Sequence, residues 1–120
     1  MSKHEIFGIS FQDLSLHSLV DKCISGALNN KIIVTPNVDH IVRAHNDTSF
    51  LTTYMKADIF VNDSRILRLI AKLCLKPIKY LVPGSDLTEA LFNELHHNKT
   101  SVCIIGGESK IIQIVKKKYT

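Results

Sequence analysis

The chain has 120 residues, of which 45% are hydrophobic and 22% are charged. This composition is ordinary for a folded protein and argues against disorder, and the length suits one domain, residues 1–120, with a buried core. The formal net charge is +4, with a run of lysines at 116–118. No aromatic residues alternate with these lysines, so binding to nucleic acid is not expected.

The cysteines and the hydropathy of the chain indicate its compartment. Cys23, Cys74 and Cys103 are far apart and form no CxxC pair, so we expect three small core residues in a reducing compartment. No apolar run approaches the about 20 residues of a membrane span, and no signal peptide is visible. We therefore expect a cytoplasmic protein.

The hydrophobic pattern predicts strands that alternate with helices. The first predicted elements are a strand or small hairpin at 6–11 that bends at Gly8, a helix from about Ser15, a strand at 31–35 and a helix from about Asn37. A short helix capped within 47–49, a strand at 57–61 and a helix from about Arg65 follow. The last are an extended run at 78–82, a helix capped by Ser85 or Asp86, a strand at 101–105 and a final helix that contains Ile111. Such alternation is typical of parallel βαβ units, so we expect a layered α/β domain. The chain ends after a helix, where the series would normally add a strand, so we expect a sheet that is incomplete at the C-terminus.

Two of the predicted helices carry more specific signals. In the helix from about Arg65, the apolar residues at helical spacing are Ile66, Leu69, Ile70, Leu73 and Cys74. We expect this stripe to face the core. In the helix after Gly84, Asp86 as the N-cap would form a capping box with Glu89.

The block Thr35-Pro36-Asn37-Val38-Asp39-His40 follows a predicted buried strand. In open α/β sheets, ligands bind at the carboxyl ends of the strands. Thr35, Asn37 and Asp39 are therefore candidates to bind a polar ligand. The local alternative is that Asn37 caps the following helix while Pro36 fixes the turn.

Asp63 is the leading candidate for chemistry because it follows the strand at 57–61. Its carboxylate should face the same edge of the sheet as Thr35 and Asn37. A partly desolvated carboxylate there can take a proton from an attacking hydroxyl. The alternative role is an N-cap for the helix that begins near Arg65.

Small residues at two strand-to-helix turns suit a phosphate group. Gly84-Ser85-Asp86 and Gly106-Gly107 both precede helices, and backbone amides at a helix N-terminus favour anions. Glycine is also the usual turn residue, so neither turn alone names a cofactor. His40 and His45 are off the spacing of two metal ligands on one helix face, and we expect neither a metal nor a cofactor.

Taken together, these motifs resemble the WecG/TagA/CpsF family of bacterial glycosyltransferases. The matching segments, in order, are Thr35 to Val42, Ala57-Asp58 with Asp63, Val82 to Leu87, and Ile104 to Gly107. The resemblance covers essentially the whole chain and implies a Rossmann-like sheet without a required metal.

The resemblance implies a reaction. Family members transfer an N-acetylmannosamine-type sugar from a UDP donor to a polyprenyl-diphosphate-linked N-acetylglucosamine acceptor, for cell-surface polysaccharides such as wall teichoic acid. It implies that Asp63 is the general base, that Thr35 and Asn37 line the pocket, and that the glycine motifs surround it near the donor diphosphate. Full-length members also dock on the membrane surface. The resemblance leaves open whether the chain forms a homo-oligomer.

Three departures from the family pattern leave an alternative open. Ser64 stands where the family usually has glycine, and Leu81 stands where it usually has an arginine, for which Lys79 is a neighbouring substitute. Family members are also usually longer, and their second half completes the sheet. The alternative is a non-catalytic, truncated remnant or an α/β binding domain that keeps the cleft without turnover.

Overall fold

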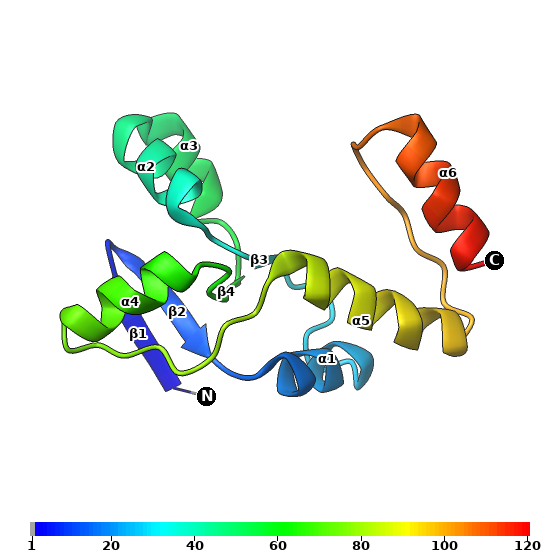
Figure 1. The fold of residues 1–120 in the computed structure, drawn as a ribbon, viewed down its shortest axis with the longest axis horizontal. Helices are drawn as coiled ribbons and strands as arrows, with labels where there is room; N and C mark the ends of the chain where they lie inside the picture. The colour runs from blue at the N-terminus through cyan, green and yellow to red at the C-terminus, as the bar shows by residue number, and fades with distance from the viewer. Residues whose placement is uncertain (1) are drawn as a thin grey trace.

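A computed structural model describes residues 2–120 as a four-stranded sheet with six helices (Figure 1). The elements are β1 (Ser2–Ile6), β2 (Ile9–Asp13), α1 (Leu16–Ile24), β3 (Ile33–Val34), α2 (Val38–Asn46), α3 (Thr48–Tyr54), β4 (Ile59–Phe60), α4 (Arg65–Leu73), α5 (Gly84–His97) and α6 (Ser109–Lys118). The strand order is β1-β2-β4-β3. β1 and β2 are antiparallel, while β4 runs parallel to both β2 and β3. The predicted α/β class with a mostly parallel sheet is confirmed.

The predicted hairpin is present and turns at Phe7 and Gly8. Both residues have positive φ, at 54° and 77°, as a tight two-residue hairpin turn requires. Glycine adopts this conformation freely, but Phe7 does so at a steric cost, and its side chain is 62% exposed. The hairpin carries β2 into the centre of the sheet, where Phe11 pairs with Phe60 of β4.

The alternation of side chains along β4 produces two hydrophobic layers. Phe60 faces the side covered by α4, where it packs in one cluster with Leu67 and Ala71. Ile59 and Val61 face the opposite side and share a cluster with residues of α1 and α5. Successive residues of a strand point to opposite faces, so this short strand holds helices on both sides of the sheet.

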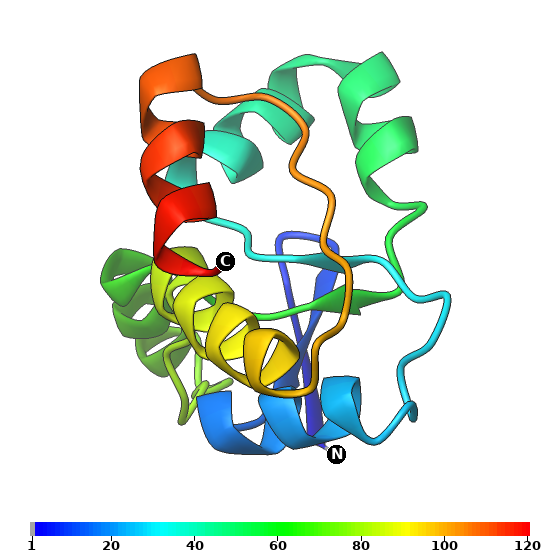
Figure 2. The same ribbon diagram turned by 90° about the vertical axis from the view of Figure 1, so that its right-hand side faces the viewer.

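The strand predicted at 101–105 is wrong. These residues are extended and exposed, and they pair with no described strand. An apolar run becomes a strand only where a neighbouring strand can accept its hydrogen bonds. The segment instead leads to α6, which rests on the end of α5 through Tyr119 against Phe92 (Figure 2).

The expected buried face of α4 and the expected burial of two cysteines also need correction. Leu67 and Ala71 face the core, whereas Ile66, Leu69 and Leu73 are 60%, 58% and 75% exposed. The helix is therefore rotated relative to the expected stripe. Cys74 follows this rotation and is exposed, and Cys103 is exposed because its segment joins no sheet. Cys23 is partly buried, and burial raises its pKa.

Tyr54 connects α3 to the sheet. Its ring stacks on Phe50 and meets the edge of Phe60, with ring centroids 5.2 and 5.8 Å away. Its hydroxyl lies 3.2 Å from Nδ1 of His40. Burial raises the pKa of Tyr54 from 10.0 to about 12, because the charged phenolate is desolvated there.

This burial predicts a loss of stability in alkaline solution. As the pH rises above 10, the tyrosine of the unfolded chain loses its proton before Tyr54 of the folded chain does, so the free energy of unfolding should fall between pH 10 and pH 12. Urea unfolding of the wild type and of Tyr54→Phe across this range checks the prediction. The variant should lose part of that pH dependence, and an identical slope for both proteins would contradict it.

Candidate active site

The loops that follow β3 and β4 lie side by side at the carboxyl edge of the sheet. The backbone N–H of Asp63 donates to the carbonyl of Pro36 over 3.2 Å. Pro36 is fully buried, while Thr35 and Asp63 are partly exposed. The structure therefore brings the two candidate residues to one edge, as the parallel pairing of β3 with β4 requires.

Asn62 fixes the loop that carries Asp63. Its side chain is 1% exposed; Oδ1 accepts from the N–H of Ser64, and Nδ2 donates to the carbonyl of Ser64, both over 2.9 Å. Its own carbonyl accepts from the N–H of Val82 over 2.7 Å. The side chain thus closes the turn around Asp63, and the backbone attaches the segment that leads to Gly84.

Gly84 touches both candidate side chains. A methyl group at this position would lie 2.9 Å from Oγ1 of Thr35 and 3.5 Å from Oδ2 of Asp63. The φ of Gly84 is not in the left-handed region, so the absence of a side chain serves close approach rather than backbone conformation. Thr35, Asp63 and Gly84, which come from three separate segments, therefore meet at one point.

Asn37 and Asp39 lie in the first turn of α2. Oδ1 of Asn37 accepts from the N–H of His40 over 3.0 Å, so Asn37 is the N-cap of this helix. Its Nδ2 is the group that can reach a ligand, because the oxygen is already bonded. Asp39 is exposed in the first turn of α2.

The N-terminus of α5 lies beside Thr35 and Asp63 without a side-chain cap. Pro83 occupies the N-cap position, so the predicted capping by Ser85 or Asp86 is wrong. The helix begins at Gly84, and Ser85 and Asp86 are exposed in its first turn. The first N–H groups of a helix have no partner within it, so those of α5 are available to a ligand.

Gly106 and Gly107 lie in a different place. They form an exposed turn before α6, with φ angles of 88° and 84°. Figure 1 and Figure 2 both show this turn apart from the start of α5. The structure therefore groups Thr35, Asp63 and Gly84, with Asn37 two residues from Thr35 along the chain, and leaves the second glycine motif outside that group.

Ser64, rather than Asp63, caps α4. Oγ of Ser64 accepts from the N–H of Leu67 over 3.2 Å, so the carboxylate of Asp63 is free of the local role that the sequence left open. The φ of Ser64 is −124°, which any residue adopts, so this turn needs no glycine. Asn62 and Ser64 have structural roles that were not predicted from the sequence; the signal for them is a run of three capping residues, 62–64, after a buried strand.

The segment that contains Leu81 is held against β2 through Lys79 and Tyr80. Leu81 is partly exposed. Nζ of Lys79 lies 5.1 Å from the centre of the Tyr80 ring, and the N–H groups of both residues donate to the carboxylate of Asp13. The segment before Gly84 is thus fixed to the end of β2.

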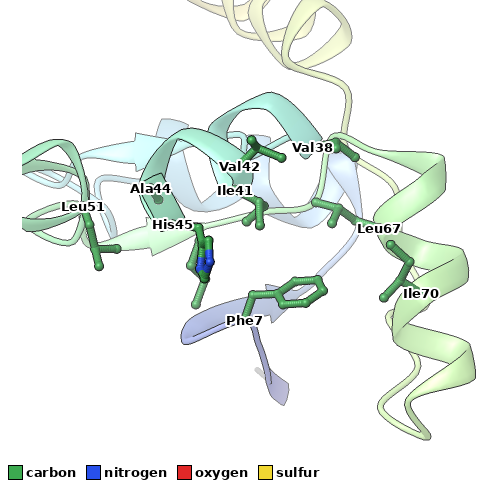
Figure 3. A pocket seen from close by; sticks show the side chains of 10 residues that line it. Phe7, Val38, Ile41, Val42, Ala44, His45, Leu51, Leu67 and Ile70 are labelled. Carbon is green, nitrogen blue, oxygen red and sulfur yellow. The ribbon is translucent and has the colours of Figure 1, made fainter. Parts of the chain in front are cut away.

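An apolar groove lies between α2, α4 and the hairpin turn (Figure 3). Its volume is about 560 Å³. Its lining includes Phe7, Val38, Val42, Leu67 and Ile70. Val38 and Leu67, which line the groove, lie in the first turns of α2 and α4. Because those helices follow Asn37 and Ser64, one end of the groove lies close to the candidate site.

Residues 2–120 contain neither a metal-binding cluster nor a membrane-spanning helix. No group of three His, Cys, Asp or Glu side chains there is arranged to hold a metal ion. None of the described helices is both long enough and apolar enough to span a bilayer.

Comparison with known protein families gives one match. The profile described as the glycosyl transferase WecG/TagA/CpsF family matches residues 4–120. The chain belongs to this family. No curated protein matches the chain. Membership in the WecG/TagA/CpsF family supports a glycosyltransferase role in polysaccharide biosynthesis. The matched residues include the three segments that meet at the site, around Thr35, Asp63 and Gly84.

The capping geometry makes a prediction that separates Ser64 from Asp63. Ser64→Ala should lower the free energy of unfolding by about 1 kcal/mol, because α4 loses its N-cap. Asp63→Ala should change it much less, since the bond from Asp63 to Pro36 uses the backbone. Urea unfolding followed by circular dichroism measures both variants. A larger loss for Asp63→Ala would show that Asp63 is the cap.

Proposed function

We propose that this protein transfers an N-acetylmannosamine-type sugar from UDP to a polyprenyl-diphosphate-linked N-acetylglucosamine acceptor. The meeting of Asp63, Thr35 and Gly84 at the uncapped start of α5 carries this proposal. It combines a free carboxylate with a place for a diphosphate within a few ångströms. Family membership supplies the reaction class.

Asp63 acts as the general base. Its carboxylate would take the proton from the acceptor hydroxyl while that oxygen forms a bond to the anomeric carbon of the donor sugar. The bond from that carbon to the diphosphate oxygen breaks, and UDP leaves with the electron pair. A positioned base of this kind contributes about 10²- to 10⁴-fold to a rate.

The first turn of α5 binds the donor diphosphate. Its N–H groups lack a side-chain cap, and the N-terminus of a helix carries partial positive charge. Gly84 lets the diphosphate approach the backbone closely, while the hydroxyl of Ser85 is exposed in the same turn. Charge that develops on the leaving oxygen would be stabilised there.

Thr35 and Asn37 position the sugar. The hydroxyl of Thr35 faces Gly84, and Nδ2 of Asn37 is available because Oδ1 caps α2. Both side chains are short and are held at the end of a strand, so they have little freedom to lose on binding.

Asp63→Asn should abolish transfer. The amide has the same shape but accepts no proton, so the rate should fall by about 10²- to 10⁴-fold. The measurement incubates the protein with UDP-N-acetylmannosamine and a lipid-diphosphate-N-acetylglucosamine analogue and quantifies the disaccharide product. Asp21→Asn, which changes an exposed carboxylate on α1, is the matched control and should keep full activity.

The outcomes of this experiment separate the candidate functions. Equal activity in the wild type and Asp63→Asn would remove Asp63 as the base. Activity in neither protein, together with binding of UDP by both, would favour the non-catalytic binding domain.

Gly84→Ala should disable the site without unfolding the protein. The added methyl group would lie 2.9 Å from Oγ1 of Thr35, so the Thr35 side chain must shift or rotate away. A misplacement of about 1 Å in a site costs about 10²-fold in rate. Alanine is a good helix former, so α5 should remain. Transfer assays measure the loss of activity, and circular dichroism measures whether the helices are retained. Asn93→Ala, which changes an exposed residue of α5, is the control. Full activity of Gly84→Ala would contradict the proposed site.

A further inference from the structure

The extended segment 101–105 has the composition of a strand but pairs with none. Val102, Ile104 and Ile105 are β-branched, which favours the backbone of a sheet, and they are 46%, 41% and 95% exposed. Within residues 2–120, the N–H and C=O groups of this segment form no hydrogen bond with other backbone groups. Figure 1 shows the segment apart from the four strands, between α5 and α6. It is therefore an exposed strand edge, a surface that pairs readily with another strand.

Two backbone features set the limits of this edge. The N–H of Thr100 already donates to the carbonyl of Leu95 over 2.8 Å. Gly106 has a φ of 88°, which lies outside the range of a strand. The unpartnered run between them is of ordinary length for a strand, and Cys103 is at its centre.

Residues of opposite charge flank this run. Lys99 precedes it and Glu108 follows it; both are exposed, and neither belongs to an ion pair of the described chain. The residues between them, 100–107, carry no charge. Two antiparallel copies would bring Lys99 of each close to Glu108 of the other, whereas two parallel copies would bring like charges together. Charge therefore favours antiparallel pairing of the segment with itself.

We propose that segment 101–105 pairs antiparallel with the same segment of a second copy of this chain. The two-fold axis passes through Cys103, so Val102 of each copy lies opposite Ile104 of the other. Such β-branched pairs stabilise neighbouring strands, and the backbone groups on the facing edges bond to each other. Because a two-fold interface uses the same surface on both copies, it closes as a dimer.

The interface lies away from the candidate active site. Gly84, at the start of α5, belongs to that site, whereas the segment follows the other end of the helix, at His97. α5 has 14 residues and is therefore about 21 Å long. Pairing through 101–105 thus uses none of Thr35, Asp63 and Gly84, and it does not depend on the proposed function.

The oligomeric state of the chain tests the proposal. One pair of short strands buries less surface than a standard interface, so light scattering over a dilution series should show a monomer that becomes a dimer as the concentration rises. Hydrogen exchange should show protection of the 101–105 amides that increases in parallel. A chain that stays monomeric up to about 1 mM, where even a weak interface is occupied, would overturn the proposal.

Cys103→Pro with Ile104→Pro tests whether backbone pairing holds the dimer. Neighbouring N–H groups of a strand point to opposite edges, so the double change removes a facing donor in either register. Dimerisation should weaken at least roughly tenfold, and circular dichroism checks that the monomer keeps its helices. Ile114→Gln, which changes a 58% exposed residue of α6, is the control and should dimerise as the wild type does. Equal dimerisation of the proline variant and the wild type would contradict strand pairing.

Charge reversal tests the direction of the pair. Lys99→Glu places a carboxylate near Glu108 of the other copy, twice in each dimer, and should weaken dimerisation roughly tenfold. Lys99→Glu with Glu108→Lys restores opposite charges and should recover the dimer. Parallel pairing would leave the single variant unchanged, because like charges would still face each other, and this result would overturn the antiparallel geometry.

Cys103 reports the register. Opposite residues of an antiparallel pair have Cβ atoms about 4.5–5.5 Å apart, close to the separation in a disulfide. Diamide, which takes up the hydrogen atoms of two thiols, should therefore link two chains through Cys103. Cys103→Ser should abolish the link, whereas Cys74→Ser, which changes an exposed cysteine outside the segment, should keep it. The opposite pattern would contradict the register.

Pairing with β3, the edge strand of the sheet, would give different results. If 101–105 joined β3 of its own chain, its amides would be protected in a monomer at every concentration. If it joined β3 of another copy, the contact would not close, and species larger than a dimer would form. Either result would overturn the proposal. Asp63→Asn should dimerise as the wild type does, so loss of transfer and loss of the dimer are separable.

Discussion

The buried side chain of Asn62 is the constraint on which the site depends. It lies two residues beyond β4. Its amide oxygen and amide nitrogen are both satisfied by the backbone of Ser64, while its carbonyl accepts from the N–H of Val82. A buried amide left without these partners would cost about 1–3 kcal/mol, so the loop has one favourable conformation. In that conformation Asp63 is partly exposed, and Gly84 lies beside its carboxylate.

The two residues of β4 determine how the remaining elements surround this loop. Phe60 bonds through its N–H to the buried side chain of Gln12 over 2.8 Å and faces α4, whereas Ile59 faces α1 and α5. β2 and β4 pair only at Phe11 and Phe60. The side chain of Gln12 there accepts a backbone hydrogen bond that a longer strand pair would make between main chains. The sheet can be this short because helices cover both of its faces, and its carboxyl edge remains accessible.

The alternation of strands and helices, the hairpin and the caps at Asn37 and Asp47 were predictable because each depends on neighbouring residues. The exposed segment at 101–105 was not, because a strand needs a partner that local sequence cannot reveal. The rotation of α4 was hidden for a related reason: apolar residues occupy more than half of its circumference, so periodicity alone does not choose the buried side. Within the site, the meeting of Thr35 and Asp63 followed from parallel strands, but the role of Asn62 required the hydrogen bonds of a buried loop.

Two of the described helices, α5 and α6, begin without a side-chain cap, and the start of α5 lies at the candidate site. α1, α2, α3 and α4 each begin with a side chain that accepts from the first turn, namely Ser15, Asn37, Asp47 and Ser64. α5 begins with Pro83, which has no such side chain, although its first turn lies against Thr35 and Asp63. A helix start that lacks a cap leaves N–H groups to be satisfied by water or by a ligand. Ser64 caps α4, so Asp63 is free of that role, and Pro83 leaves α5 uncapped. The same edge of the sheet therefore offers a carboxylate that can accept a proton and N–H groups that can bind an anion, the two groups that the proposed transfer uses.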